Sequence, residues 1–133
     1  KSTWLAGRAG VLSSDAMRAL VRDDETDQSI HGLVFKLLRD FLRYRLQLGA
    51  EVTYIDATNL TRKHRRPFVK MAQYAEASVE AVFFDTPLEE CLRRNAARER
   101  VVPPEAITMF AARLQPPSHE EGFSRIQRFG IED

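Results

Sequence analysis

Apolar residues recur at spacings of three and four between Gln28 and Leu48, which is the periodicity of one face of an α-helix. Gly49 follows at the position where a glycine commonly ends a helix. Similar patterns and proline positions predict helices elsewhere in the chain. These run from Thr3 to about Arg8, onward from Asp15 as a candidate N-cap, from His64 to Ala77, from Pro87 to about Arg98, and from Pro103 onward.

Short runs rich in apolar, β-branched and aromatic residues predict strands at residues 11–13, 51–56, 79–85 and 123–129. Strands that alternate with helices favour an α/β fold with a parallel sheet flanked by helices, because parallel strands need crossover connections. No repeat or low-complexity linker divides the chain, so we expect one domain over residues 1–133. The expected aromatic core consists of Trp4, Phe41, Phe83, Phe84 and Phe110.

The composition narrows the class of protein only slightly. The single cysteine among 133 residues, Cys91, excludes a disulfide framework and is expected to be a core thiol. The three histidines are expected at the surface because their spacing does not suit a metal site. No apolar run is long enough to span a membrane and no secretory signal is visible, so we expect a cytoplasmic protein without a membrane partner. The formal charge of +1 does not indicate a particular kind of partner.

The first three residues, Lys1, Ser2 and Thr3, match the end of a Walker A phosphate loop, G-x-x-x-x-G-K-[ST]. In such a loop the lysine neutralises the β- and γ-phosphates, and the serine hydroxyl binds Mg²⁺. Three residues are a weak motif alone, and a solvated terminus is the alternative. Because the chain begins with Lys1 instead of Met and lacks the motif's glycines, we expect the numbering to start inside a longer polypeptide.

Aspartates stand at the ends of three of the predicted strands, where α/β proteins bind their ligands. Asp15 is either an N-cap or a general base that faces an acceptor hydroxyl, with Arg18 one turn later as a ligand for an acceptor phosphate. Asp56 belongs either to a polar turn or to the surroundings of a Mg²⁺ ion in a nucleotide site. Asp85 ends the third strand.

Two arginine-rich segments add candidate phosphate ligands. Residues 62–66 begin a predicted helix, where positive charge opposes the helix dipole, so a simple solvated face explains them poorly. Residues 93–100 end a predicted helix, where cations are favourable for structural reasons alone. Arg94 and Arg98 are four residues apart and are expected to share a face, from which they could contact a triphosphate.

Taken together and in order, these segments resemble the kinase domain of bacterial polynucleotide kinase-phosphatase. The resemblance covers nearly the whole chain. It is carried by residues 1–3, 13–18, 23–28, 45–49 and 55–59, by Arg65, and by residues 87–89, 94–95 and 121–123. It implies a P-loop kinase fold with an arginine-bearing lid and an ATP- and Mg²⁺-dependent transferase that phosphorylates a 5′-hydroxyl of RNA or DNA during repair.

The resemblance also implies roles for individual residues. Lys1, Asp15, Arg18 and Arg94 would be catalytic, and Lys1, Ser2, Thr3, Arg94 and Arg98 would bind the nucleotide. Ser2 and Asp56 would lie at the metal, and Arg18, Gln28, Asn59 and Arg65 on the acceptor side. Asp15 would be the general base and Arg94 the lid arginine. The partner would be a nucleic acid with a 5′-hydroxyl end, and phosphatase or ligase domains could lie downstream.

Two other functions fit the same residues. One is a P-loop kinase that acts on a sugar, an antibiotic or a nucleoside. The other is a non-catalytic nucleotide- or RNA-binding module that uses its basic segments for phosphate contacts, with the steep salt dependence such contacts cause. Arg18 favours an acceptor that carries a phosphate beside its hydroxyl.

The family's first strand and the glycines of its phosphate loop do not occur in residues 1–133. That strand lies in the middle of the family's sheet, and each buried backbone group left unpaired costs about 1–3 kcal/mol. We therefore predict that residues 1–133 alone fold poorly and are inactive. We predict that roughly a dozen added N-terminal residues, enough for a strand and the loop, restore ATP binding. We call that form the extended chain. Cooperative melting and ATP hydrolysis by residues 1–133 alone would contradict this prediction.

Overall fold

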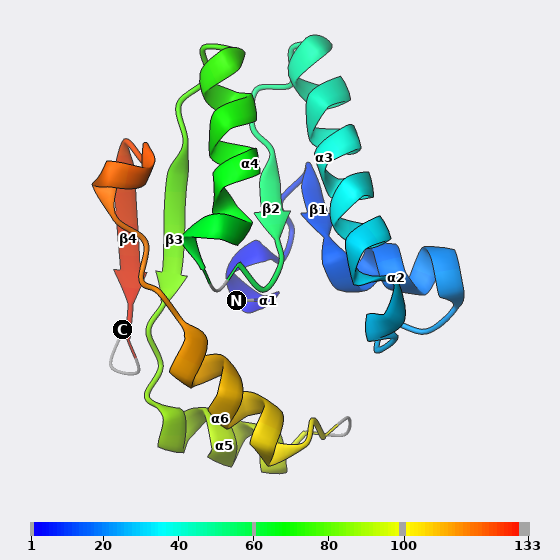
Figure 1. Ribbon diagram of the computed structural model, residues 1–133, viewed down its shortest axis with the longest axis vertical. Coiled ribbons are helices and arrows are strands. Elements are labelled where there is room, and N and C mark those ends of the chain that lie inside the picture. The colour runs from blue at the N-terminus through cyan, green and yellow to red at the C-terminus, as the bar shows by residue number, and fades with distance from the viewer. Residues whose placement is uncertain (1, 60, 99–100, 131–133) are drawn as a thin grey trace. The chain divides into compact units, whose positions relative to one another are not determined.

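The computed structural model describes residues 2–59, 61–98 and 101–130 (Figure 1). The chain forms two compact units, and each is described by itself. The first contains residues 1–58 and 70–77, and the second contains residues 59–69 and 78–133. Within the described ranges no helix has both the length and the apolar character needed to cross a membrane.

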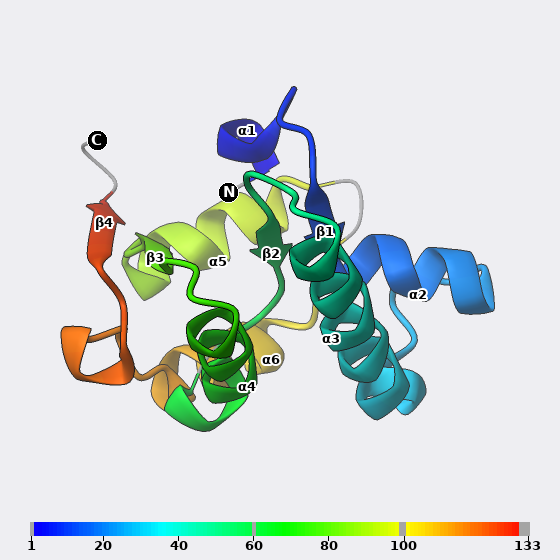
Figure 2. The same ribbon diagram turned by 90° about the horizontal axis from the view of Figure 1, so that it is seen from above.

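The first unit places two helices against a short strand. Figure 2 shows helix α3 running beside strand β1, and helix α2 also packs against both of these elements. The elements of this unit are α1 (Ser2–Leu5), β1 (Val11–Ser13), α2 (Ser14–Arg22), the 3₁₀ helix η1 (Gln28–Ile30), α3 (His31–Gln47) and β2 (Tyr54–Asp56). Strand β2 is shorter than the predicted 51–56. Val52 is exposed, and its carbonyl accepts a hydrogen bond from the side chain of Arg45 instead of from the backbone of a neighbouring strand.

The second unit contains a longer strand pair and a pair of helices. Its elements are β3 (Glu80–Phe84), α5 (Leu88–Ala96), α6 (Pro104–Arg113), the 3₁₀ helix η2 (His119–Glu121) and β4 (Arg125–Phe129). Helices α5 and α6 pack against each other. Helix α4 (Arg62–Tyr74) contributes its residues up to Val69 to this unit and its later residues to the first.

All described strands are paired in parallel, as predicted. Strand β1 pairs with β2 so that Ser13 lies opposite Asp56, and β3 pairs with β4 so that Phe84 lies opposite Phe129. The α/β class, with parallel strands flanked by helices, is therefore confirmed. In the described part of the chain the four strands form two separate pairs, where we had expected one sheet.

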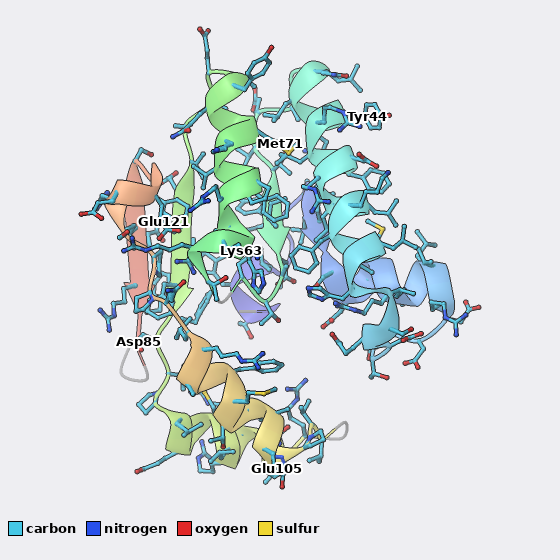
Figure 3. The ribbon with its side chains drawn as sticks, in the orientation of Figure 1. Tyr44, Lys63, Met71, Asp85, Glu105 and Glu121 are labelled. Atoms are coloured by element: carbon cyan, nitrogen blue, oxygen red, sulfur yellow. The ribbon has the colours of Figure 1, made fainter. Side chains whose placement is uncertain are left out.

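The core of the first unit is aliphatic to a greater extent than predicted. Val34 and Leu38 on α3 are completely buried, and Phe35, Leu42 and Met17 are less than a tenth exposed. The predicted core residue Phe41 is 44% exposed, and Phe110 of the second unit is 39% exposed, so both predictions were wrong. The apolar residues of α3 therefore extend beyond the buried face of the helix onto an exposed side, where Phe41 lies. Tyr44 extends this exposed side and projects away from β1 (Figure 3).

Gly10 precedes β1 in a conformation that requires glycine. Its φ is +77°, and a Cβ atom built there would lie 2.5 Å from Arg45 Nη2 and 2.8 Å from the Val52 carbonyl oxygen. Arg45 cannot simply move aside, because its Nη2 donates to that same carbonyl at 2.9 Å and its Nε donates to Thr53 Oγ1 at 2.8 Å. The Gly10 carbonyl also accepts the Tyr54 N–H at 2.9 Å, which joins the start of β1 to β2.

We predict that Gly10→Ala destabilises the protein more than Gly7→Ala does. Gly7 has almost the same φ of +78° but nothing within 4 Å of an added Cβ, so it serves as a matched control for backbone strain alone. Strain of this kind costs about 1–2 kcal/mol, and the overpacking at Gly10 adds roughly 1–3 kcal/mol. Urea unfolding of the extended chain measures both values, and equal losses would show that the contact with Arg45 and Val52 has no effect.

Candidate active site

Helix α2 begins immediately after β1, and Ser13 caps it. The Ser13 side chain accepts the Ala16 N–H at 3.2 Å while its backbone remains extended. The interpretation of Asp15 as the N-cap was therefore wrong, because the cap lies two residues earlier. Asp15 is in the first helical turn, where a negative charge is favourable, and its carboxylate is not used for capping. The side chain of Asp15 is 58% exposed.

Arg18 lies one turn after Asp15 and is almost completely buried. Its side chain is 5% exposed, and its Nη1 is 3.4 Å from Asp15 Oδ1. Its Nη2 is 3.1 Å from His31 Nδ1 at the start of α3. The Nε of Arg18 is buried and has no hydrogen-bond partner among the described residues. The structure therefore holds a guanidinium cation in the interior with one long contact to a half-exposed carboxylate, an arrangement that an anionic ligand would stabilise.

His31 is a residue of this cluster that the sequence analysis missed. It was expected to be a simple surface histidine, and it is exposed, but it also contacts the guanidinium of Arg18 and packs against the Phe35 ring at 4.5 Å between centroids. Arg18 and His31 are thirteen positions apart, and only the packing of α2 on α3 brings them together. No local pattern in the sequence carries that information.

Asp56 ends β2 at the same edge of the strand pair from which α2 starts. The register of β1 and β2 sets Asp56 opposite Ser13, two residues before Asp15. Asp56 is half-buried. Gln28 lies further along the first unit at the start of η1, is exposed, and donates to the Thr26 carbonyl oxygen at 3.5 Å. The first unit thus brings Asp15 and Arg18 into contact and places Asp56 at the same strand ends.

The residues at the start of the chain are only partly described. Lys1 lies outside the described residues, and so does the side chain of Ser2, whose backbone begins α1. Thr3 is exposed on that helix. The assignment of these three residues to the nucleotide stays a prediction.

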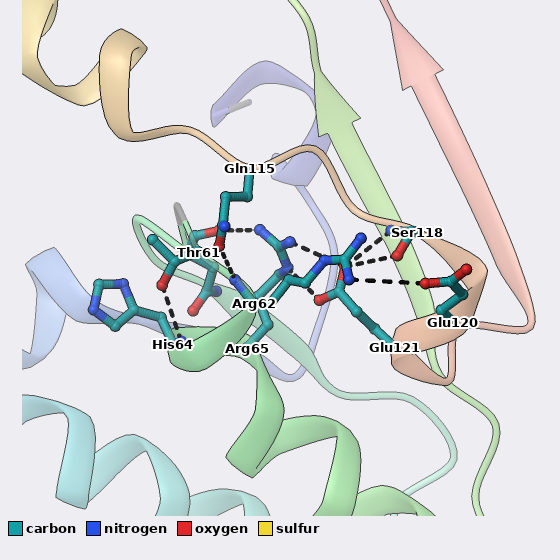
Figure 4. A network of polar contacts seen from close by, with 9 residues as sticks. Thr61, Arg62, His64, Arg65, Gln115, Ser118, Glu120 and Glu121 are labelled. Carbon is teal, nitrogen blue, oxygen red and sulfur yellow. Dashed lines mark hydrogen bonds and ion pairs between the residues drawn. The ribbon is translucent and has the colours of Figure 1, made fainter.

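The acceptor-side candidates Asn59 and Arg65 contact each other in the second unit. Arg65 Nη1 donates to the Asn59 carbonyl oxygen at 2.9 Å, while its Nε and Nη2 donate to the two carboxylate oxygens of Glu121 at 2.8 Å and 3.0 Å. Figure 4 shows the side chain of Arg65 directed at that of Glu121. These side chains are 9% and 8% exposed. Asn59 Oδ1 is buried without a hydrogen-bond partner in the described part of the chain. Arg65 is thus a structural brace, and its contact with substrate stays a prediction.

This network explains the basic start of helix α4. Arg62 Nη1 lies 3.8 Å from Glu120 Oε2, and the Arg62 N–H donates to Gln115 Oε1 at 3.0 Å (Figure 4). Glu120 and Glu121 therefore offset positive charge that would otherwise oppose the helix dipole. Burial raises the pKa of Glu121, but the hydrogen bonds from Arg65 and the Ser118 N–H and the charges of Arg65 and Arg62 outweigh it and lower the pKa overall.

Arg94 and Arg98 do not share a helical face, contrary to our expectation. Helix α5 ends at Ala96, and Arg98 lies in the bend after it. Arg94 Nε donates to Glu90 Oε1 at 2.9 Å, and Arg93 binds the same carboxylate. The hydrogen bond from Arg93, with a smaller contribution from Arg94, lowers the pKa of Glu90 to about 2.

The remaining predicted groups have local partners. Asp85 lies beyond the end of β3 (Figure 3). It accepts a hydrogen bond from Arg128 Nε at 2.8 Å. Cys91 is half-buried and its thiol lies 3.5 Å from the Thr86 carbonyl oxygen. Among the described residues no group of three or more His, Cys, Asp or Glu side chains is arranged to hold a metal ion.

Comparison with known proteins assigns this arrangement to a family. A family model described as an AAA domain matches residues 1–117. The chain belongs to this AAA domain family. The chain is also similar to human L-seryl-tRNA(Sec) kinase, with 42% identity over 40 residues. That match covers 30% of this chain and 12% of the human protein, so the chain spans only a small part of that relative.

Membership supports a P-loop kinase-like domain that uses a nucleotide, in agreement with the parallel strands and flanking helices. The relative found in the second comparison is, by its name, also a kinase.

We predict that Glu121→Gln destabilises the AAA domain by roughly 3–5 kcal/mol at pH 7, because it leaves the buried Arg65 cation without its countercharge. Glu80→Gln is the control: Glu80 pairs with Arg125 at 3.9 Å in the same unit, but both side chains are more than half exposed. Exposed pairs contribute about 0–1 kcal/mol. Urea unfolding measures the two losses.

The same pair predicts a pH dependence. Since the pKa of Glu121 is below its ordinary value of 4.5, its stabilising effect is complete above that value and is lost as the pH falls through the folded-state pKa. The difference in stability between the unsubstituted protein and Glu121→Gln should therefore shrink below about pH 4.5. A difference that stays constant from pH 7 to pH 3 would contradict this assignment.

Proposed function

We propose that this AAA domain transfers the γ-phosphoryl group of ATP to the 5′-hydroxyl end of RNA or DNA, as a polynucleotide 5′-kinase in nucleic-acid repair. The observation that carries the proposal is the pairing of Asp15 with Arg18 in the first turns of α2. An exposed carboxylate stands beside a buried guanidinium whose Nε has no partner in the described part of the chain. The carboxylate can accept the proton of a hydroxyl, and the guanidinium can bind a phosphate. A polynucleotide end that is phosphorylated on its 5′-hydroxyl requires both contacts.

Asp15 is the general base in this mechanism. The acceptor 5′ oxygen attacks the γ-phosphorus, its proton passes to a carboxylate oxygen of Asp15, and the bond between the γ-phosphorus and the bridging oxygen breaks as ADP leaves. The cap at Ser13 supports this role, because it satisfies the helix end without using the Asp15 carboxylate. The exposure of Asp15 leaves the carboxylate accessible to an acceptor.

Arg18 binds the phosphate beside the acceptor hydroxyl. Burial and the contact with His31 restrict the guanidinium, so little conformational entropy remains to be lost when a phosphate binds. A phosphate oxygen at Nε would satisfy the donor that has no partner within the described ranges. Three further residues are assigned to the acceptor side only by the resemblance to the polynucleotide kinase domain. These are Gln28, Asn59 and Arg65.

The nucleotide side rests on the family and on residue types. Lys1, Ser2 and Thr3 would bind the phosphates, with Lys1 offsetting their charge. Arg94 would contact the transferring phosphoryl as the lid arginine, and Arg98 would lie beside the nucleotide. The oxygen ligands of Ser2 and Asp56 are the type that Mg²⁺ prefers, so these residues fit a metal held beside the nucleotide. When bound, Mg²⁺ neutralises charge on the triphosphate.

Transfer of labelled phosphate from ATP by the extended chain tests the proposal. The acceptors are a 5′-hydroxyl RNA oligonucleotide, the matching DNA, and a nucleoside without a 3′-phosphate. We expect transfer to an oligonucleotide and much less to the nucleoside. Transfer to the nucleoside or to sugars alone would favour a small-molecule kinase. Salt-sensitive oligonucleotide binding without any transfer would favour the non-catalytic module.

We predict that Asp15→Ala lowers the transfer rate by about 10²–10⁴-fold while ATP affinity stays nearly unchanged, because it removes the base and the carboxylate contact of Arg18 but no residue assigned to the nucleotide. Glu51→Gln is a suitable control, since Glu51 is an exposed carboxylate of the same unit outside the candidate site. Single-turnover transfer and equilibrium ATP binding measure the two effects separately. An equal loss of both would contradict the assignment of Asp15 as the base.

A further inference from the structure

Asn95 is an almost fully buried polar residue near the end of helix α5, and its residue exposure is 2%. Both polar atoms of its side chain are used, and both contact the same residue. Asn95 Nδ2 donates to the Val102 carbonyl oxygen at 2.6 Å, and Asn95 Oδ1 accepts the Val102 N–H at 2.9 Å. The side-chain amide thus pairs with a backbone residue as a neighbouring strand would, across seven positions of sequence.

Val102 depends on this partner because two prolines come directly after it. Pro103 and Pro104 lack N–H groups, and a residue before proline is restricted to extended backbone. Pro103 itself is extended, with φ −53° and ψ 129°, and α6 begins at Pro104. Val102 therefore lies outside both helices, where the Asn95 amide satisfies its N–H and its carbonyl.

The backbone around Asn95 carries Arg94, the candidate lid arginine, and Arg98, a candidate nucleotide ligand. Arg94 directly precedes it, and its carbonyl accepts the Ala97 N–H at 3.3 Å. The Asn95 carbonyl accepts the Arg98 N–H at 3.2 Å. The backbone of Asn95 therefore holds the turn that contains Arg98. Its side chain holds Val102, shortly before the start of α6.

We propose that Asn95 is a positioning residue that ties Val102 to the end of α5 and so orients Arg94 toward the transferring phosphoryl group and Arg98 beside the nucleotide. This inference rests on the proposed function, because it assumes that these arginines contact the triphosphate. Arginines held by a rigid backbone lose less entropy when they bind a phosphate and stabilise transition-state charge more effectively. Asn95 itself does not contact the nucleotide in this account.

Asn95→Asp changes one functional group of the clamp that Asn95 forms on Val102. It keeps an oxygen for the Val102 N–H but removes the donor to the Val102 carbonyl and places a carboxylate oxygen against it. Ala96→Asp adds the same charge at the next position, which is exposed, and serves as the matched control. Asn95→Ala removes both hydrogen bonds without adding charge, and it answers the same question if the aspartate variant does not fold.

Amide exchange at Val102, measured by NMR on the extended chain, tests the clamp directly. We expect exchange to accelerate by about tenfold or more in both Asn95 variants and to stay within about twofold in Ala96→Asp. Unchanged exchange at Val102 would overturn the proposal. Global unfolding of both Asn95 variants would also overturn it, since Asn95 would then serve the stability of the fold as a whole.

Transfer kinetics test the link to the arginines. We expect the kcat of Asn95→Asp to fall by about tenfold with the KM for the acceptor unchanged, and this loss to shrink in an Arg94→Ala, Arg98→Ala background. An equal loss in both backgrounds would contradict the positioning role. If the unsubstituted extended chain transfers no phosphate, the proposed function fails, whereas Val102 exchange still decides whether the clamp exists.

Discussion

Parallel pairing of strands is the constraint on which the candidate site depends. Two parallel strands run in the same direction, so the chain must return through a helix and both carboxyl ends meet at one edge. In the β1–β2 pair, Ser13 and Asp56 are opposite each other at that edge, and α2 starts there with Asp15 in its first turn. Antiparallel pairing of the same segments would send these two carboxylates to opposite ends of the pair.

The sequence was sufficient for most elements because their signals are local. The apolar spacing and Gly49 locate α3, and the prolines and acidic first turns mark the starts of α5 and α6. Errors arose where a long-range contact decides the outcome. Phe41 belongs to the apolar stripe of α3, but burial of that helix depends on what packs against each side, which periodicity alone does not specify.

The sequence was enough to name residues of the candidate site, but not to predict which of them contact each other. Asp15 and Arg18 could be named because one helical turn separates them, whereas the contact of His31 with Arg18 depends on packing between two helices. The basic start of α4 was recognisable as unfavourable when simply solvated. Its partner Glu121 lies 56 residues from Arg65, and no pattern near either residue indicates the pair.

The carboxylate of Glu90 has a consequence for how Arg94 could engage a nucleotide. With its pKa near 2, Glu90 stays ionised at any pH that a cell maintains, so acidification does not detach Arg94. The side chain of Arg94 is 55% exposed, so another anion can reach its guanidinium, and a triphosphate carries more negative charge than a single carboxylate. The exchange would replace one ion pair with another, so the arginine would respond to the arrival of nucleotide while remaining insensitive to proton concentration.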